Sequence, residues 1–275
     1  ISHIVNISES LLNSKIDDKK KEKINLYTKI FVIIVGKKIK LDKEKKKEAI
    51  KFVMQNSSKF NIKMDISKSI IGILEGKDFE IKDYDEILLT MTKGMFDEIR
   101  LFILKKKKLY IDCLSLLLDP GVNIDKIDEM VFTFINMTLT RMQIKKLTDE
   151  YKSFKKEVKN NLITIANKSL ENCYTIINFW FPKDKKDCVN ALRKDPQMQL
   201  NYIEYTIKKI IKVKESNDTE FDENEDYIKS ILSRHVQLLC KLNKKKEILP
   251  WLKKLSDYPI KECIDICKDN KVFDC

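Results

Sequence analysis

The sequence is poor in glycine and proline, with five of each among 275 residues. An all-β domain needs such turn-forming residues roughly every eight to twelve positions, so their scarcity excludes a β-sandwich or β-barrel. Apolar residues make up 43% of the chain and recur at helical spacing, which excludes wholesale disorder. The sequence therefore predicts an all-α fold.

Recognised catalytic signatures are also missing. The chain contains no G-x-x-x-x-G-K-[ST], no G-x-S-x-G and no H-E-x-x-H motif. It has only two histidines, His3 and His235, and helix packing or a surface position is the expected role of His235. Acidic residues such as Asp83, Asp85 and Glu86 fit helix caps and solvated helix faces. We therefore expect no enzyme activity, no catalytic residue, no bound metal and no cofactor.

Arginine is scarce in a chain of formal net charge +12. Only four of its 54 Lys and Arg residues are arginine: Arg100, Arg141, Arg193 and Arg234. Base readout and bidentate phosphate contacts favour arginine, whereas scattered lysine beside glutamate is typical of solvated helix faces. No nucleic-acid-binding module is visible, so we expect a tolerant lysine surface and no nucleic-acid partner. Clusters such as 105–108 leave open an attraction to anionic lipid, at about 1 kcal/mol per lysine.

The cysteines fit a reduced protein interior. They number seven, without an N-terminal signal peptide, at Cys113, Cys173, Cys188, Cys240, Cys263, Cys267 and Cys275. Cys263 and Cys267 lie one helical turn apart and, with His235 and Cys240, supply four potential zinc ligands. Paired zinc-binding cysteines usually have about two residues between them, so packing in the core is the preferred interpretation.

The aromatic residues also allow either a binding role or a packing role. Tyr202 and Tyr205 are three residues apart, a spacing compatible with a base-stacking pair, but such tyrosines on an otherwise apolar helix more often pack in the core or in a groove. Trp180 and Trp251 are expected at interfaces between helices.

The C-terminal stretch, 230–275, contains three apolar stripes at three-to-four spacing. Pro250 lies in the first turn of the second helix, and Pro259 precedes the third, both positions that tolerate proline. No one of these helices can bury its stripe alone, which indicates an α-solenoid of stacked antiparallel helix pairs. The stripes are Ile231, Leu232, Val236, Leu239 and Leu242; Ile248, Leu252 and Leu255; and Ile260, Cys263, Ile264 and Cys267.

Helical periodicity and capping residues continue upstream. Thr148, Ser169, Asp184 and Asp195 are predicted N-caps, and the acidic stretch 214–226 is predicted to be an exposed loop. The expected helices cover 24–35, 42–58, 66–74, two segments within 84–104 separated near Gly94, 109–119, 125–139, 148–165, 169–181, a short segment after 184, and 195–211.

Four segments resemble the clathrin heavy-chain repeat of vacuolar protein sorting tethers. They are HVQLLCKLNKKKEILPWLKKLSDYPIKECIDICKDNKVFDC at 235–275, VFTFINMTL at 131–139, NFWF at 178–181 and ALRKDPQMQLNYIEYTI at 191–207. Their order and approximate spacing match over residues 110–275. The pattern is most similar to the vacuolar protein sorting-associated protein 8 family, a CORVET subunit, and next to the protein 41 subunit of HOPS.

The resemblance implies a domain organisation and a function. We expect a helical segment at 1–105 continuous with the solenoid, a clathrin-repeat-like solenoid at 106–275, and a chain that is a fragment of a longer protein. The implied function is a non-enzymatic scaffold in an endosomal or vacuolar membrane-tethering complex, cytoplasmic and peripheral on the endosome or vacuole membrane. Its implied partners are other tethering-complex subunits and, through the full-length protein, small GTPases and SNAREs.

The alternative is a basic helical-repeat adaptor for nucleic acid or acidic protein cargo. That function predicts lysines converging on one concave surface and an affinity that falls steeply with salt.

Overall fold

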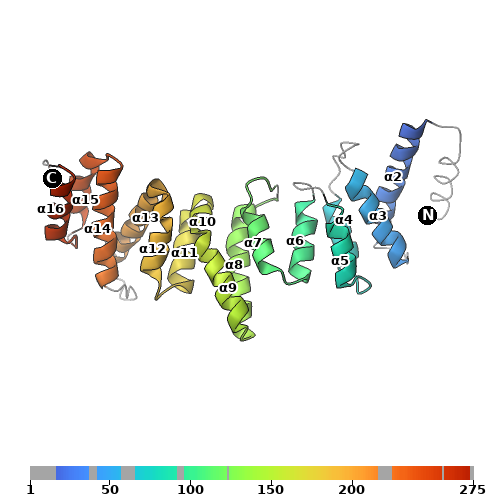
Figure 1. Cartoon of the computed structure of the whole chain (residues 1–275), viewed down its shortest axis with the longest axis horizontal. Helices are drawn as coiled ribbons and strands as arrows, with labels where there is room; N and C mark the ends of the chain where they lie inside the picture. Colours follow the sequence, from blue (N-terminus) through green and yellow to red (C-terminus); the bar gives the residue numbers. More distant parts are fainter. Residues whose placement is uncertain are drawn as a thin grey trace. The chain divides into compact units, whose positions relative to one another are not determined.

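The computed structural model describes residues 17–36, 42–56, 66–91, 96–122, 124–215, 225–255 and 257–272. Within these ranges every regular element is helical: fifteen α-helices, α2 to α16, and two short 3-10 helices (Figure 1). The all-α prediction is therefore confirmed for the described residues. The chain divides into two compact units, Ile1–Ile127 and Asp128–Cys275.

The first unit is built from six described helices that contact near neighbours in sequence. Helix α2 packs on α3 and α4, α3 packs on α5, and α6 packs on α4, α5 and α7. The apolar core runs from Leu26 on α2 to Ile103 on α6. The helices are α2 (Asp18–Gly36), α3 (Lys43–Asn56), α4 (Ser67–Leu74), α5 (Ile81–Leu88), α6 (Asp97–Lys106) and α7 (Tyr110–Leu118).

The second unit follows the same local contact pattern. Helix α11 contacts α10 and α13, α14 contacts α12, α13 and α16, and α12 also contacts α9 and α10. Its elements are α8 (Ile127–Ile144), which begins at the boundary, α9 (Thr148–Asn160), α10 (Leu162–Lys168), α11 (Leu170–Trp180), α12 (Lys185–Ala191), η1 (Leu192–Lys194), α13 (Pro196–Glu215), α14 (Glu225–Lys241), η2 (Lys245–Glu247), α15 (Ile248–Lys254) and α16 (Ile260–Asp269).

Two of the predicted N-caps make the expected hydrogen bond. The Ser169 hydroxyl accepts from the Asn172 amide at 3.2 Å, and the Asp195 carboxylate accepts from the Met198 amide at 2.9 Å. Asp184 stands at the cap position of α12 without a side-chain cap bond. The N-cap predicted at Thr148 is one residue too late, because Leu147 stands at the cap position and Thr148 is the first residue inside α9. Most of the predicted loop at 214–226 lies outside the described residues.

A single predicted helix over 148–165 is wrong, because the structure has two helices, α9 and α10, separated at Asn161. The Asn161 side-chain amide donates to the Glu157 carbonyl at 2.9 Å and to the Glu157 carboxylate at 2.8 Å. Asparagine offers the backbone such local alternatives to helical hydrogen bonding. The apolar stripe continues through the break, so periodicity alone did not reveal it.

Four helices are followed by a residue in the left-handed conformation that is not glycine. Lys108, Lys146, Asn243 and Lys271 have φ of 60°, 53°, 58° and 54° after α6, α8, α14 and α16. After each one, the next amide donates to a carbonyl five residues back, as from Leu147 to Met142 at 3.0 Å. This is the Schellman arrangement, in which glycine is the usual left-handed residue. The glycine-poor chain therefore ends these helices at a conformational cost of about 1 kcal/mol for each non-glycine residue.

Replacing Lys146 with glycine is expected to stabilise the protein by about 1 kcal/mol, because glycine adopts the left-handed conformation without a Cβ clash. Chemical denaturation followed by circular dichroism measures the change. The matched control is Lys152→Gly at an exposed position inside α9, where glycine should destabilise by about 1 kcal/mol. A loss of stability in both variants would contradict the left-handed conformation of Lys146.

The third C-terminal stripe is only partly buried. Cys263 and Cys267 face the core together with Ile266, whereas Ile260 and Ile264 are 53% and 47% exposed. The prediction that these two isoleucines are part of the buried stripe is therefore wrong. Both lie on the flank of α16, beside the face that packs on α14.

Among the described helices, none combines the length and apolar character needed to cross a membrane.

Candidate functional site

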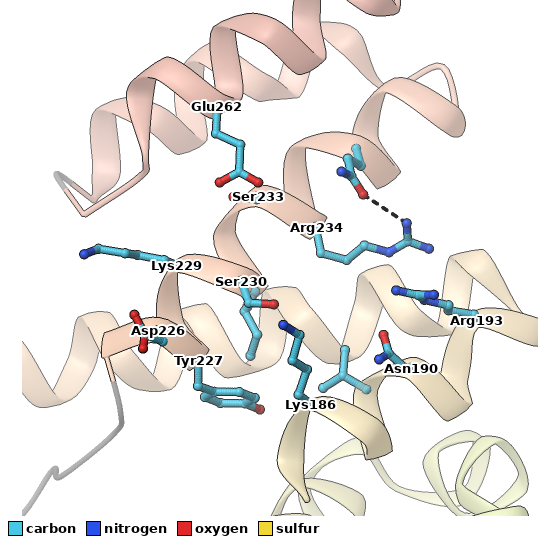
Figure 2. A pocket seen from close by; sticks show the side chains of 13 residues that line it. Lys186, Asn190, Arg193, Asp226, Tyr227, Lys229, Ser230, Ser233, Arg234 and Glu262 are labelled. Atoms are coloured by element: carbon cyan, nitrogen blue, oxygen red, sulfur yellow. Dashed lines mark hydrogen bonds between the residues drawn. The ribbon is translucent and has the colours of Figure 1, made fainter.

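The second unit contains a hollow of about 380 Å³ walled by α12, α14 and α16 (Figure 2). We call it the basic pocket. Basic side chains outnumber acidic ones in its wall, so the pocket favours an anion over a cation. The charged residues that line it are Lys186, Arg193, Lys229, Arg234, Asp226 and Glu262.

Helical spacing places these side chains on facing surfaces. Lys186, Asn190 and Arg193 recur at intervals of four and three along α12 and its 3-10 extension η1, so they share one face. Ser230 and Arg234 share a face of α14 for the same reason. Helices α12 and α14 are in contact, and both faces line the pocket. Figure 2 shows Arg193 and Arg234 pointing into the same part of it.

Arg234 is held in place by glutamines. The Gln199 side-chain oxygen accepts from Nε and Nη2 of Arg234 at 3.2 Å and 2.9 Å, and the Gln237 side-chain oxygen accepts from Nη1 at 3.1 Å. Gln199 is itself buried and donates to the Val189 carbonyl on α12 at 2.8 Å. This chain of bonds fixes the guanidinium group relative to the α12 backbone.

Of the four basic side chains in this wall, Lys229 pairs with Glu225 at 2.8 Å. No carboxylate within the described residues forms an ion pair with Lys186, Arg193 or Arg234. Partial burial, followed by repulsion from Arg193, lowers the pKa of the Arg234 guanidinium. Two arginines therefore approach each other without a counter-charge, which is an unfavourable arrangement that an anion would relieve.

Ser233 adds an unpaired hydroxyl to the same pocket. Its side chain is only 4% exposed, and its oxygen has no hydrogen-bond partner among the described residues. Leaving a buried hydroxyl unpaired costs about 1–3 kcal/mol. A ligand atom that reached this hydroxyl would supply its missing hydrogen-bond partner.

His235, also on α14, is buried and does not line the basic pocket. Its Nδ1 is 2.8 Å from the Tyr258 hydroxyl, its Nε2 is 3.7 Å from a Glu204 carboxylate oxygen, and its ring meets Trp251 edge-on at 5.0 Å. The proximity of His235 lowers the pKa of Glu204, and burial raises the pKa of Tyr258. Because His235 is fully buried, this group connects helices and does not reach a substrate. His3 lies outside the described residues.

Replacing Tyr258 with phenylalanine is expected to destabilise the protein by about 1–2 kcal/mol, because it leaves a buried His235 nitrogen unpaired. Urea denaturation measures the loss. Tyr27→Phe removes a hydroxyl from an exposed side chain and should change stability by less than about 0.5 kcal/mol. Equal effects in the two variants would show that the His235 contact contributes nothing.

A second ionic cluster lies in the first unit. Asp83, expected in a cap or on a solvated face, is fully buried and accepts hydrogen bonds from the Lys47 ammonium at 3.1 Å and from the Glu80 amide at 2.9 Å. Lys43 pairs at 2.8 Å with Oδ2, the carboxylate oxygen that also accepts from the Glu80 amide. Burial alone would raise the pKa of Asp83, but these three hydrogen bonds outweigh it and hold the pKa well below its usual range. The cluster is internally satisfied, which indicates a structural role.

The cysteines take the predicted packing role. Six of the seven are described, and all six are buried without a disulfide; Cys275 lies outside the described residues. Burial raises the thiol pKa to about 12 for Cys113, Cys173 and Cys188, and to about 11 for Cys263. Within the described ranges no three His, Cys, Asp or Glu residues are arranged to hold a metal ion. His235, Cys240, Cys263 and Cys267 are therefore not brought together as ligands.

The aromatic residues also pack as predicted. Tyr202 is fully buried, and Tyr174 contacts both Tyr202 and Tyr205, with ring centroids at 6.5 Å and 5.6 Å. Trp180 and Trp251 are both buried. Tyr202, Trp180 and Trp251 are therefore unavailable for stacking on bases, whereas Tyr205 is half-buried.

Sequence patterns did not identify the basic pocket. Its two arginines lie on different helices far apart in the chain, and only the packing of α12 on α14 brings them together. The feature of the sequence that could have indicated the pocket is the rarity of arginine. Two of the four arginines in the sequence line this single pocket.

No protein-family model, curated protein or solved structure matches this chain. The likeness to clathrin heavy-chain repeats therefore rests on the sequence segments alone.

Proposed function

We propose that the chain is a non-enzymatic scaffold in which stacked antiparallel helix pairs form an α-solenoid. The supporting observation is the range of its helix contacts. In each unit the main partners of a helix are close neighbours in sequence, as in α2–α4–α6 and α11–α13–α14–α16. A chain of such local contacts is what a one-dimensional repeat architecture requires.

The state of the buried polar groups supports a scaffold rather than an enzyme. The Asp83 cluster is satisfied by lysines and a backbone amide, and the His235 group is enclosed by aromatic rings. Catalytic acids and bases need to reach a substrate, and the Asp83 carboxylate and the His235 ring are both fully buried.

The distribution of ion pairs supports a solvated lysine surface. Lysines in both units pair with carboxylates, as in Lys29–Glu48 at 2.8 Å and Lys168–Asp128 at 2.9 Å. Within the cluster 105–108, Lys107 pairs with Asp85. Such exposed pairs contribute little stability, but they neutralise positive charge locally. They favour the scaffold over an adaptor whose lysines converge on nucleic acid.

The scaffold belongs, in this proposal, to a subunit of an endosomal or vacuolar tethering complex, cytoplasmic and peripheral on the membrane. The support is the resemblance of residues 110–275 to the repeats of such tethers. Stacked helices would hold other tethering subunits and, through the full-length protein, small GTPases and SNAREs at fixed spacing. That role requires extended binding surface and no chemistry.

Affinity purification of the tagged chain from cell extract at moderate salt tests this function. Mass spectrometry should identify other subunits of a tethering complex, and nuclease treatment should leave their recovery unchanged. Recovery of nucleic acid that dissociates as salt rises, without sorting subunits, would contradict the scaffold and favour the basic adaptor.

A further inference from the structure

The choice of residue in the basic pocket points to an oxyanion. Arginine is rare in this chain, yet Arg193 and Arg234 line the same hollow. A guanidinium group presents paired N–H donors that match the oxygens of a phosphate or carboxylate, which a lysine ammonium cannot do. A tolerant basic surface would be expected to contain lysine at both positions, as most basic sites of the chain do.

Arg234 retains donors for a ligand. Its three hydrogen bonds, all to glutamine oxygens, use three of the five N–H groups of a guanidinium. One N–H therefore remains on each terminal nitrogen. Because glutamine is neutral, these bonds orient the group without cancelling its charge.

Arg193 and Lys186 extend the positive surface on the α12 side. Neither forms an ion pair within the described residues, and Arg193 lies close enough to destabilise the charge on Arg234. Such a cluster is preorganised for an anion, because the cost of bringing like charges together is already met by the fold. The buried, unpaired Ser233 hydroxyl supplies a neutral hydrogen-bonding group in the same hollow.

The size and the acidic residues of the pocket restrict the ligand. A volume of about 380 Å³ suits a small molecule or a single headgroup. Asp226 and Glu262 in the remaining wall disfavour a polyanion such as nucleic acid, but their oxygens can accept hydrogen bonds from ligand hydroxyls. The combination fits a phosphate group attached to a hydroxylated carbon skeleton.

We propose that the basic pocket binds a phosphate monoester, whose phosphate lies against Arg193, Arg234 and Lys186 and whose hydroxyl groups face Ser233 and the acidic wall. This binding is separate from the scaffold function and holds whether or not the chain is a tethering subunit. The monoester is either a soluble metabolite or a lipid headgroup, since the same chemistry occurs in both.

Calorimetric titration of the full chain with glycerol 3-phosphate, at constant ionic strength, tests the site. Saturable binding is expected, with no binding of glycerol. Arg234→Gln and Arg193→Gln should each weaken it about tenfold or more, whereas Arg141→Gln removes an exposed arginine on α8 and should leave it unchanged. Ser233→Ala should weaken binding about threefold without lowering the melting temperature, which a purely structural hydroxyl would not do.

Vesicle sedimentation distinguishes the two sources. Phosphatidylcholine vesicles containing phosphatidylinositol 4-phosphate carry a monoester, whereas phosphatidylserine carries only a diester. Arg234-dependent binding to the first vesicles alone would identify a lipid headgroup; binding of glycerol 3-phosphate without vesicle binding would identify a soluble ligand. Absence of saturable binding in both assays, or equal weakening by Arg141→Gln and Arg234→Gln, would overturn the proposal.

Discussion

Replacing Trp180 with alanine is expected to destabilise the second unit by about 4 kcal/mol. Trp180 is buried at the end of α11, and its indole N–H donates to the Asn136 side-chain oxygen on α8 at 2.5 Å. The substitution leaves a cavity and removes the partner of Asn136, so packing and hydrogen-bonding losses add. Chemical denaturation followed by circular dichroism measures the total.

Two further variants separate the causes. Trp180→Phe keeps most of the ring volume but not the donor, so it should show a smaller loss of about 1–2 kcal/mol. Phe179→Ala removes the adjacent ring, which is 69% exposed, and should cost less than about 1 kcal/mol. If Phe179→Ala were as damaging as Trp180→Ala, burial at the α8–α11 contact would not be the cause.

Replacing Asp83 with alanine is expected to destabilise the first unit by about 3 kcal/mol, because it removes the buried carboxylate that accepts from two lysine ammonium groups and a backbone amide. Lys47 is itself largely buried, and it would lose its contact with Asp83 and keep only Glu44 and Glu86. The amide of Glu80 at the start of α5 would lose its acceptor as well. Asp78→Ala, which removes the exposed partner of Lys46 at 4.0 Å, should change stability by less than about 0.5 kcal/mol.

The Asp83 effect should depend on pH. Hydrogen bonds hold the pKa of Asp83 in the folded protein below the ordinary carboxyl value. The stabilisation that Asp83 gives the fold is therefore complete above the ordinary carboxyl pKa and declines as the pH falls below it. The stability difference between the native chain and Asp83→Ala should therefore shrink from about pH 5 downwards. A difference that stays constant to pH 2 would show that the carboxylate charge is not responsible.

Local sequence features were sufficient for much of the secondary structure. Ser169 and Asp195 cap the helices as predicted because their hydrogen bonds reach only three residues ahead. The break at Asn161 has no signal in the hydrophobic pattern, because the apolar stripe runs through it. Ile260 and Ile264 were assigned to the core because periodicity identifies an apolar face but not the width that a neighbouring helix covers.

The candidate site depended on contacts that no local pattern contains. Arg193 and Arg234 meet only because α12 packs on α14, and Gln199 from α13 then orients the second arginine. Asp83 illustrates the same limit. The local sequence is the same whether an acidic residue in the first turn of a helix is solvated or enclosed by lysines. The burial of Asp83 could therefore not be predicted.

Alkylation of the buried cysteines can report local unfolding of each unit. Cys113 lies in the first unit and Cys173 in the second, and both thiols have a pKa of about 12. An unfolded thiol has a pKa of about 8.5, so iodoacetamide at neutral pH reacts almost entirely with locally opened molecules. Peptide mass spectrometry then measures the alkylation rate in each unit separately. Asp83→Ala should accelerate alkylation chiefly at Cys113, and Trp180→Ala chiefly at Cys173.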